Sequence, residues 1–205
     1  MNGNSFVQSL DAIFRWITRL AFVNLLWIAF SLLGLIFVGI FPATVATLAI
    51  TRKWLTGSRE VRIFKVFKDT FKKEFIVANI IGWLLTILGI LLYVNYQVMV
   101  LMDDSLPIVT IFAYFLILFF YGLFIIWVFP MIANYNGSIK QYLKNSFIIG
   151  IGKIHVTLAL MIWLFVVLYV SLEFPATIIF CSISIAAVGW NWLTLRAFDN
   201  LKQEQ

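Results

Sequence analysis

Long, uninterrupted apolar runs constrain the fold of this chain more than any other feature. The sequence contains five of them, at residues 20–40, 76–100, 108–129, 155–172 and 175–195. Each approaches the roughly 20 apolar residues that a helix needs to cross a bilayer. With 63% hydrophobic and 12% charged residues, against about 45–50% and about 25% in soluble domains, the chain has too little polar surface for a water-soluble globule. We therefore expect an integral membrane protein.

All five runs are predicted to be helical. A helix satisfies every backbone hydrogen bond within its own segment, which lipid requires. The runs also lack the ten-residue apolar and polar alternation of barrel strands. Aromatic residues typical of the lipid–water interface lie toward the ends of the later runs: Trp83, Tyr93, Tyr96, Trp127, Trp163, Tyr169, Trp190 and Trp192. The predicted fold is a single all-α, polytopic transmembrane domain over residues 1–205.

The charged residues predict which connections face the cytoplasm. Residues 51–75 and 138–153 carry most of the excess of basic over acidic groups, and the net charge is +6. The connection at residues 102–107 contains Asp103 and Asp104 but no basic residue, and the last hairpin turns near Glu173. Because cytoplasmic loops are rich in lysine and arginine, we expect a multi-pass protein of the bacterial cytoplasmic membrane with its C-terminus inside.

The first apolar run allows two topologies. In one, a single span ends near Pro42 and continues as a short cytoplasmic-side helix, which gives five spans and an extracellular N-terminus. In the other, the chain turns at Pro42 and re-crosses between Ala43 and Trp54, which gives six spans and keeps Arg15 and Arg19 inside. The second obeys the positive-inside rule better. The apolar part of its return helix, however, has only about half the required length.

Two Phe-Pro pairs favour the five-span arrangement through an internal repeat. Phe41-Pro42 and Phe129-Pro130 each follow an apolar run, and each precedes an aromatic and basic stretch and then another span. We predict a duplication of residues 20–100 and 108–172, followed by an extra helix at 175–195. Same-orientation repeats of this kind occur in membrane transporters.

The stretch after residue 61 is predicted to be a basic amphipathic helix at the cytoplasmic interface. Its aromatic and basic residues recur at spacings of three and four. Such a helix would bury its phenylalanines in lipid and hold its cations at anionic headgroups, or dock on a partner. The candidate docking residues, with those of the second basic stretch, are Arg62, Phe64, Lys65, Phe67, Lys68, Phe71, Lys72, Lys140, Tyr142 and Lys144.

No arrangement of residues predicts a reaction, a metal site or a cofactor. The chain has one histidine, His155, and one cysteine, Cys181, and it lacks the G-x-x-x-x-G-K and H-E-x-x-H motifs. No ionisable residue stands at the middle of a predicted span, which disfavours an ion-coupled pump. No base-reading motif accompanies the basic stretches, so nucleic acid is not expected as a partner. We predict a protein that is not an enzyme.

The order of these features resembles the YesL family of bacterial membrane proteins of unknown function. The resemblance rests on Phe41-Pro42-Ala43-Thr44-Val45-Ala46, Arg52-Lys53-Trp54, the aromatic and basic stretch from Phe64 to Phe75, and the second Phe129-Pro130. Members are often encoded beside ABC-type importers for polysaccharide fragments. The resemblance therefore implies an accessory role in carbohydrate uptake, with ABC permease subunits as partners.

Two other functions stay open. An independent facilitator or small channel would bring polar residues together around one cavity at the bilayer centre. A lipid-binding, membrane-organising protein would use the phenylalanine and lysine helix to bind anionic headgroups.

Overall fold

The computed structural model describes residues 3–58, 61–102 and 107–203, and this part of the chain is helical without a strand. An all-α fold is thus confirmed. The helices in chain order are α1 (Gly3–Leu33), α2 (Ile40–Leu55), α3 (Ile63–Lys73), α4 (Phe75–Met102), α5 (Ile108–Asn134), α6 (Ile139–Gly152), α7 (Ile154–Glu173), α8 (Ala176–Phe180) and α9 (Ser182–Gln203). The predicted acidic pair Asp103 and Asp104 lies outside the described residues.

Four described helices are long and apolar enough to cross a membrane, as a multi-pass protein requires. They cover Leu10–Leu33 in α1, Phe75–Met102, Ile108–Asn134 and Ile154–Glu173. The predicted runs at 76–100, 108–129 and 155–172 coincide with α4, α5 and α7 to within a few residues. The first span begins earlier than residue 20 and ends at Leu33, before the expected Ile40.

The fifth predicted span is not one helix, so the expected count of five is not confirmed. The run at 175–195 divides into α8 and α9, with the break at Cys181 (φ −155°, ψ −12°). The hydroxyl groups of Ser171, Ser182 and Thr177 hydrogen-bond to one another beside this break, at 2.7 and 3.0 Å. Beyond it, α9 continues past residue 195 into the polar C-terminal segment.

A tight turn at residues 34–39 separates α1 from α2. Leu35 and Ile36 adopt positive φ angles of 54° and 64°, a conformation that costs energy for a β-branched side chain such as isoleucine. The backbones of Gly34 and Gly39 pack so closely that a Cβ atom on Gly34 would lie 2.5 Å from the Cα of Gly39. The chain then enters α2 with Pro42 in the first turn, where proline is well tolerated.

Helix α2 is short and folds back along α1: the Trp27 indole N–H donates to the Thr44 hydroxyl at 3.1 Å, and the Trp16 and Trp54 rings lie 5.6 Å apart. Its 16 residues rise about 24 Å, less than the roughly 30 Å of a hydrocarbon core. It is also largely buried and packs on α1, α3, α4, α5 and α9. The apolar sequence from residue 43 onward thus faces protein on several sides.

Labelling of introduced cysteines decides between the two topologies. In a Cys181→Ala background, the five-span arrangement predicts that Ser5→Cys reacts with a membrane-impermeant maleimide in intact cells, because it places the N-terminus outside. Gly57→Cys, in the basic connection after α2, should react only after the cells are opened. Protection of both positions in intact cells would instead support six spans.

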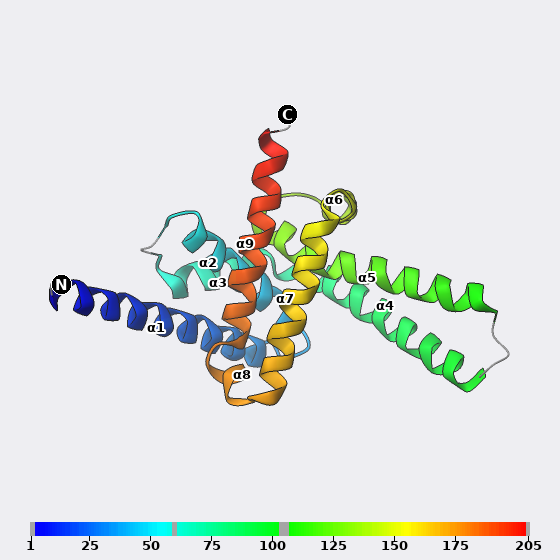
Figure 1. Cartoon of the computed structure of the whole chain (residues 1–205), viewed down its shortest axis with the longest axis horizontal. Coiled ribbons are helices and arrows are strands. Elements are labelled where there is room, and N and C mark those ends of the chain that lie inside the picture. Colours follow the sequence, from blue (N-terminus) through cyan, green and yellow to red (C-terminus); the bar gives the residue numbers. More distant parts are fainter. Residues whose placement is uncertain (1–2, 59–60, 103–106, 204–205) are drawn as a thin grey trace.

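The helices do not form one parallel bundle. Figure 1 shows α1 extending to one side of the centre and the α4–α5 hairpin to the other, while α7 and α9 run crosswise between them. The far halves of α4 and α5 expose apolar side chains around most of their circumference, as helices surrounded by lipid do. Because α1 and the α4–α5 hairpin run crosswise to α7 and α9, at least one of these two groups of helices must be tilted from the bilayer normal.

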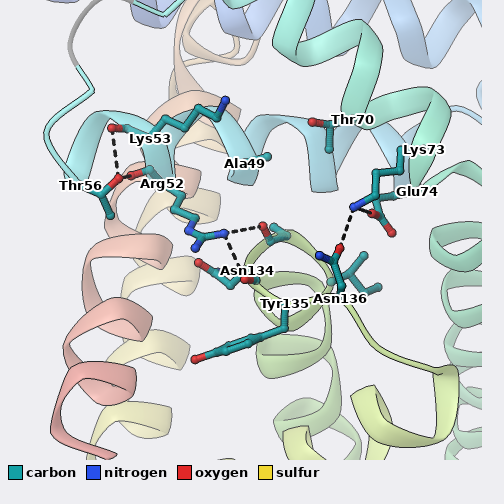
Figure 2. A pocket seen from close by; sticks show the side chains of 12 residues that line it. Ala49, Arg52, Lys53, Thr56, Thr70, Lys73, Glu74, Asn134, Tyr135 and Asn136 are labelled. Carbon is teal, nitrogen blue, oxygen red and sulfur yellow. Dashed lines mark hydrogen bonds and ion pairs between the residues drawn. The ribbon is translucent and has the colours of Figure 1, made fainter. Parts of the chain in front are cut away.

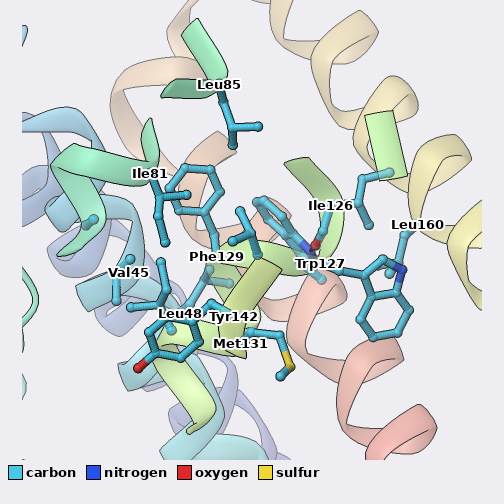
Figure 3. Packing of buried hydrophobic residues seen from close by; sticks show 14 of the residues in the cluster. Val45, Leu48, Ile81, Leu85, Ile126, Trp127, Phe129, Met131, Tyr142 and Leu160 are labelled. Carbon is cyan, nitrogen blue, oxygen red and sulfur yellow. Dashed lines mark hydrogen bonds between the residues drawn. The ribbon is translucent and has the colours of Figure 1, made fainter. Parts of the chain in front are cut away.

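The centre of the molecule is a core that the ends of several helices share. Trp127, Leu160, Ile81 and Leu48 are 0–1% exposed and come from α5, α7, α4 and α2 (Figure 3). A smaller cluster around Phe67 joins α1, α2 and α3. These two clusters hold together helices whose outer ends point in different directions.

Two buried asparagines link helices that are far apart in sequence. The Asn24 amide nitrogen donates to the carbonyls of Ile178 and Ile179, both at 2.7 Å. Its oxygen accepts from the backbone N–H groups of Ile183 and Ser184, at 3.0 and 3.4 Å. Asn24 thus satisfies the last carbonyls of α8 and the first amides of α9, the groups that a helix break leaves without partners.

The second asparagine, Asn191 of α9, serves α2. Its amide nitrogen donates to the carbonyl of Leu48 and to the hydroxyl of Thr51, both at 2.6 Å. Asn191 and Thr51 are fully buried. Interhelical hydrogen bonds of this kind stabilise membrane proteins by about 0.6–2 kcal/mol each.

The two Phe-Pro pairs meet in space but occupy different helix positions. Phe41 and Phe129 stack with ring centroids 6.2 Å apart and an interplanar angle of 10°. Pro42 lies in the first turn of α2, whereas Pro130 lies inside α5, near its end. The order of a basic helix followed by an apolar helix does recur, as α3–α4 and α6–α7. Duplication of residues 20–100 and 108–172 stays a prediction.

Candidate functional site

The predicted basic helix is present as α3 (Ile63–Lys73), and it ends two residues before Phe75, the last phenylalanine of the pattern. Glu74 is its C-cap and Phe75 begins α4. Five cations of this segment are exposed: Arg62, Lys65, Lys68, Lys72 and Lys73. The polar face of the helix is therefore available to headgroups, water or a partner.

The aromatic face of α3 packs on protein, not on lipid as we expected. Phe67 is 0% exposed, and its ring lies 5.0 Å from that of Phe30 in α1. Phe71 also lies 5.0 Å from Phe30, whereas Phe64 remains 52% exposed. The apolar stripe attaches α3 to α1 and α2, because those helices present aromatic and aliphatic side chains at the same level.

The second basic stretch forms α6, which begins with a capping box. The Ser138 hydroxyl accepts from the Gln141 amide N–H, and the Gln141 side-chain oxygen accepts from the Ser138 N–H. Lys140 and Lys144 are exposed. Tyr142 is 3% exposed, and its hydroxyl donates to the Tyr135 carbonyl and accepts from the Gly137 N–H. Tyr142 thus holds the α5–α6 connection, and the exposed lysines are left to contact a partner.

An open polar cleft of about 410 Å³ lies beside the C-terminal end of α3, next to the connection between α5 and α6. The ends of α2, α3 and α5 border it, and the α5–α6 connection closes one side (Figure 2). Its lining residues are Ala49, Arg52, Lys53, Thr56, Thr70, Lys73, Glu74, Ile132, Ala133, Asn134, Tyr135 and Asn136. We refer to it below as the basic cleft. Its volume is within the range of ligand-binding pockets.

Arg52 fixes one wall of the basic cleft. One guanidinium nitrogen, Nη1, donates to the carbonyls of Ala133 and Asn134 at 3.3 and 3.0 Å (Figure 2). These carbonyls close α5, where the helix dipole places partial negative charge. Arg52 therefore caps α5. The sequence predicts only that its charge lies on the cytoplasmic side.

The opposite wall contains a charge pair. Lys73 Nζ lies 3.0 Å from a Glu74 carboxylate oxygen and donates to Asn136 Oδ1 at 2.7 Å. Glu74 is only 7% exposed, so Lys73 compensates a carboxylate that is largely removed from water. Lys53 forms no ion pair within the described residues. The cleft thus combines three cations with a single acid, and among the described residues only Lys73 of the three cations has a charged partner.

The basic cleft is also lined by side-chain amides, and one of them is incompletely hydrogen-bonded. The side-chain oxygen of Asn134 is buried and has no hydrogen-bond partner within the described part of the protein, although its nitrogen donates to the Pro130 carbonyl. Glu74, Asn134 and Asn136 are not among the site residues predicted from the sequence. The sequence marks them only as polar residues next to the predicted cytoplasmic ends of spans.

The isolated reactive residues are not brought together. His155 is exposed at the start of α7, and Cys181 lies at the α8–α9 break. Within the described residues, no three histidine, cysteine or acidic side chains converge on one point.

Three curated proteins of Bacillus subtilis (strain 168) are similar to this chain. "Uncharacterized protein YesL" is 30% identical over 202 residues, which is 98% of this chain and 95% of that protein. "Uncharacterized protein YteU" is 31% identical over 83% of this chain and 77% of its own length. "Uncharacterized protein YesV" is 29% identical over 92% and 90%.

A family profile described as "Protein of unknown function, DUF624" matches residues 20–96. This range contains the first Phe-Pro pair and the whole of α3. No solved structure matches the chain.

Proposed function

This chain belongs to the YesL-like family of unknown function, and from this premise we propose that it is a non-enzymatic accessory component of an ABC-type carbohydrate importer. It lies in the bacterial cytoplasmic membrane with its C-terminus inside. The basic cleft and the exposed lysines of α3 dock on the cytoplasmic side of a permease subunit. The importer itself is suggested by the resemblance described above.

The observation that carries the proposal is that the two faces of α3 have different roles. Phe67 attaches the helix to the protein core, while Lys65 and Lys68 are exposed. A helix that only lay on the membrane would turn its phenylalanines toward lipid. In this protein the apolar face of α3 packs on α1 and α2. The exposed cations on its other face therefore form a surface that suits an acidic partner.

The polar residues within the spans do not favour the alternative of a facilitator. Asn24, Asn191 and Thr157 are fully buried and hydrogen-bonded to backbone carbonyls or to neighbouring hydroxyls. They are thus used for helix packing and do not line a polar cavity. A channel would need such groups to face water along a path.

Removal of two α3 charges should release a permease subunit. We expect Lys65→Gln/Lys68→Gln to reduce the recovery of permease subunits at least fivefold in an affinity pull-down from native membranes. Rim charges act mainly on association, so high salt should reduce recovery by the wild-type protein as well. Subunits are to be identified and quantified by mass spectrometry.

The matched control removes two cations from α1. Arg15→Gln/Arg19→Gln changes the net charge equally but leaves α3 and the basic cleft intact, and it should retain the partner. If both variants lost the permease subunits equally, the interaction would depend only on net charge and the proposed role of α3 would be wrong. Recovery of the chain alone from wild-type membranes, together with solute flux in reconstituted vesicles, would favour the facilitator.

A further inference from the structure

A second cavity has a different lining, which is apolar. It is an apolar groove of about 330 Å³ between α1, α7 and α9. The residues that line it are Trp16, Leu20, Trp163, Ile185, Val188, Gly189, Trp192 and Leu193. We call it the tryptophan groove, because each of the three helices contributes one tryptophan.

The walls of the tryptophan groove are held in place by contacts outside it. The Trp163 indole N–H donates to the Ala186 carbonyl at 3.2 Å, and its ring packs directly on Gly189, where a side chain would clash. Trp16 packs edge-on against Trp54 with ring centroids 5.6 Å apart. The groove is therefore preformed.

A cation lies at the rim of this apolar groove. The Arg196 guanidinium carbon is 3.7 Å from the centre of the Trp192 ring. Stacking uses the face of the guanidinium and leaves its N–H edge free to donate, which suits phosphate oxygens. Arg196 is exposed and forms no ion pair within the described residues.

Arg19 adds a second cation beside the α1 wall. It lies three residues from Trp16, so the two side chains share one helix face. Arg19 is half-buried. The groove is thus apolar inside and positively charged at its edge.

We propose that the tryptophan groove binds one acyl chain of an anionic phospholipid, whose phosphate is held by Arg196. The apolar lining suits a hydrocarbon chain, and a volume of about 330 Å³ is too small for a partner helix, which is about 10 Å wide with its side chains. The charge at the rim selects an anionic headgroup. The C-terminal position of Arg196 agrees with the cytoplasmic leaflet, where anionic lipids are concentrated. This proposal does not depend on a permease partner.

Competition between two lipids tests the headgroup part of the proposal. The purified protein is to be mixed with detergent micelles that contain equal amounts of phosphatidylglycerol and phosphatidylcholine, and retained lipid measured by native mass spectrometry. We expect one phosphatidylglycerol per chain, preferred about fivefold over phosphatidylcholine, the preference that one cation near the surface provides. Arg196→Gln should abolish the preference, while Arg15→Gln, which removes an exposed cation on α1 that does not line the groove, should preserve it.

A variant that fills the groove tests the chain part. Val188→Trp should lose both lipids together, since it removes the space for the acyl chain. Retention of one lipid by Val188→Trp, or equal retention of both lipids by the wild-type protein, would overturn the proposal and leave only bulk lipid at this surface. Arg196 is exposed, so the Arg196→Gln variant should fold normally. If Val188→Trp does not fold, the lipid preference of Arg196→Gln still decides the question.

Discussion

The Asn24→Leu variant is expected to lose at least about 3 kcal/mol of stability, the largest effect of any polar substitution in the protein. Asn24 is fully buried and makes four hydrogen bonds to the backbone around the α8–α9 break. Leucine would leave two carbonyls and two N–H groups without partners, at about 1–3 kcal/mol for each group that stays buried. In lipid, no water can replace these partners.

Two measurements check this expectation. Thermal unfolding in detergent should show a lower midpoint, and Cys181 should react faster with a maleimide because the break around it opens. Asn95→Leu is the matched control, since Asn95 is exposed and bonds only to a carbonyl of its own helix, Leu91, at 3.0 Å. If Asn24→Leu and Asn95→Leu were equally stable, Asn24 would have no role in holding α8 and α9 on α1.

The Trp127→Ala variant is expected to cost about 3–5 kcal/mol, the typical value for removal of a buried tryptophan side chain. Trp127 is 0% exposed, and its indole N–H donates to the Thr157 hydroxyl at 2.9 Å. The Thr157 hydroxyl in turn donates to the Gly150 carbonyl at 2.8 Å, and Phe198 of α9 packs on the Trp127 ring. One side chain thus connects α5, α6, α7 and α9.

For a chain of this length, such a loss corresponds to a fall in the unfolding midpoint on the order of 10 °C. Differential scanning fluorimetry in detergent measures it. Trp83→Ala supplies the control: Trp83 is 38% exposed and contacts Phe41 at one edge, so its removal should lower the midpoint by less than half as much. A similar fall in both variants would argue that Trp127 does not organise the core.

The sequence predicts the positions of α4, α5 and α7 well because each is a continuous apolar run bounded by charges or proline. It does not predict the α8–α9 break, because residues 176–188 contain no glycine, proline or charge in their interior. The groups that stabilise the break come largely from Asn24, more than 150 residues away. A local pattern cannot reveal a distant hydrogen-bond partner.

The same limit applies to the candidate site. The spacing of Phe64, Phe67 and Phe71 correctly predicts an amphipathic helix, but lipid and a neighbouring helix are equally apolar, so the pattern cannot distinguish them. The sequence predicts Arg52 only as a charge on the cytoplasmic side, whereas its role at the end of α5 depends on how α2 and α5 pack. The basic cleft follows from three helix ends that meet only in the folded protein.

The partners of Asn24 are made late during synthesis. At about 5–20 residues per second, the ribosome adds residues 178–184 several seconds or more after α1 has emerged. Until then the amide of Asn24 lacks the backbone partners that it has in the folded protein, although α1 already has α2 and α3 to pack on. A nascent chain that stops before α9 should therefore expose a polar defect in lipid, by which quality-control proteases can distinguish an unfinished copy from a complete one.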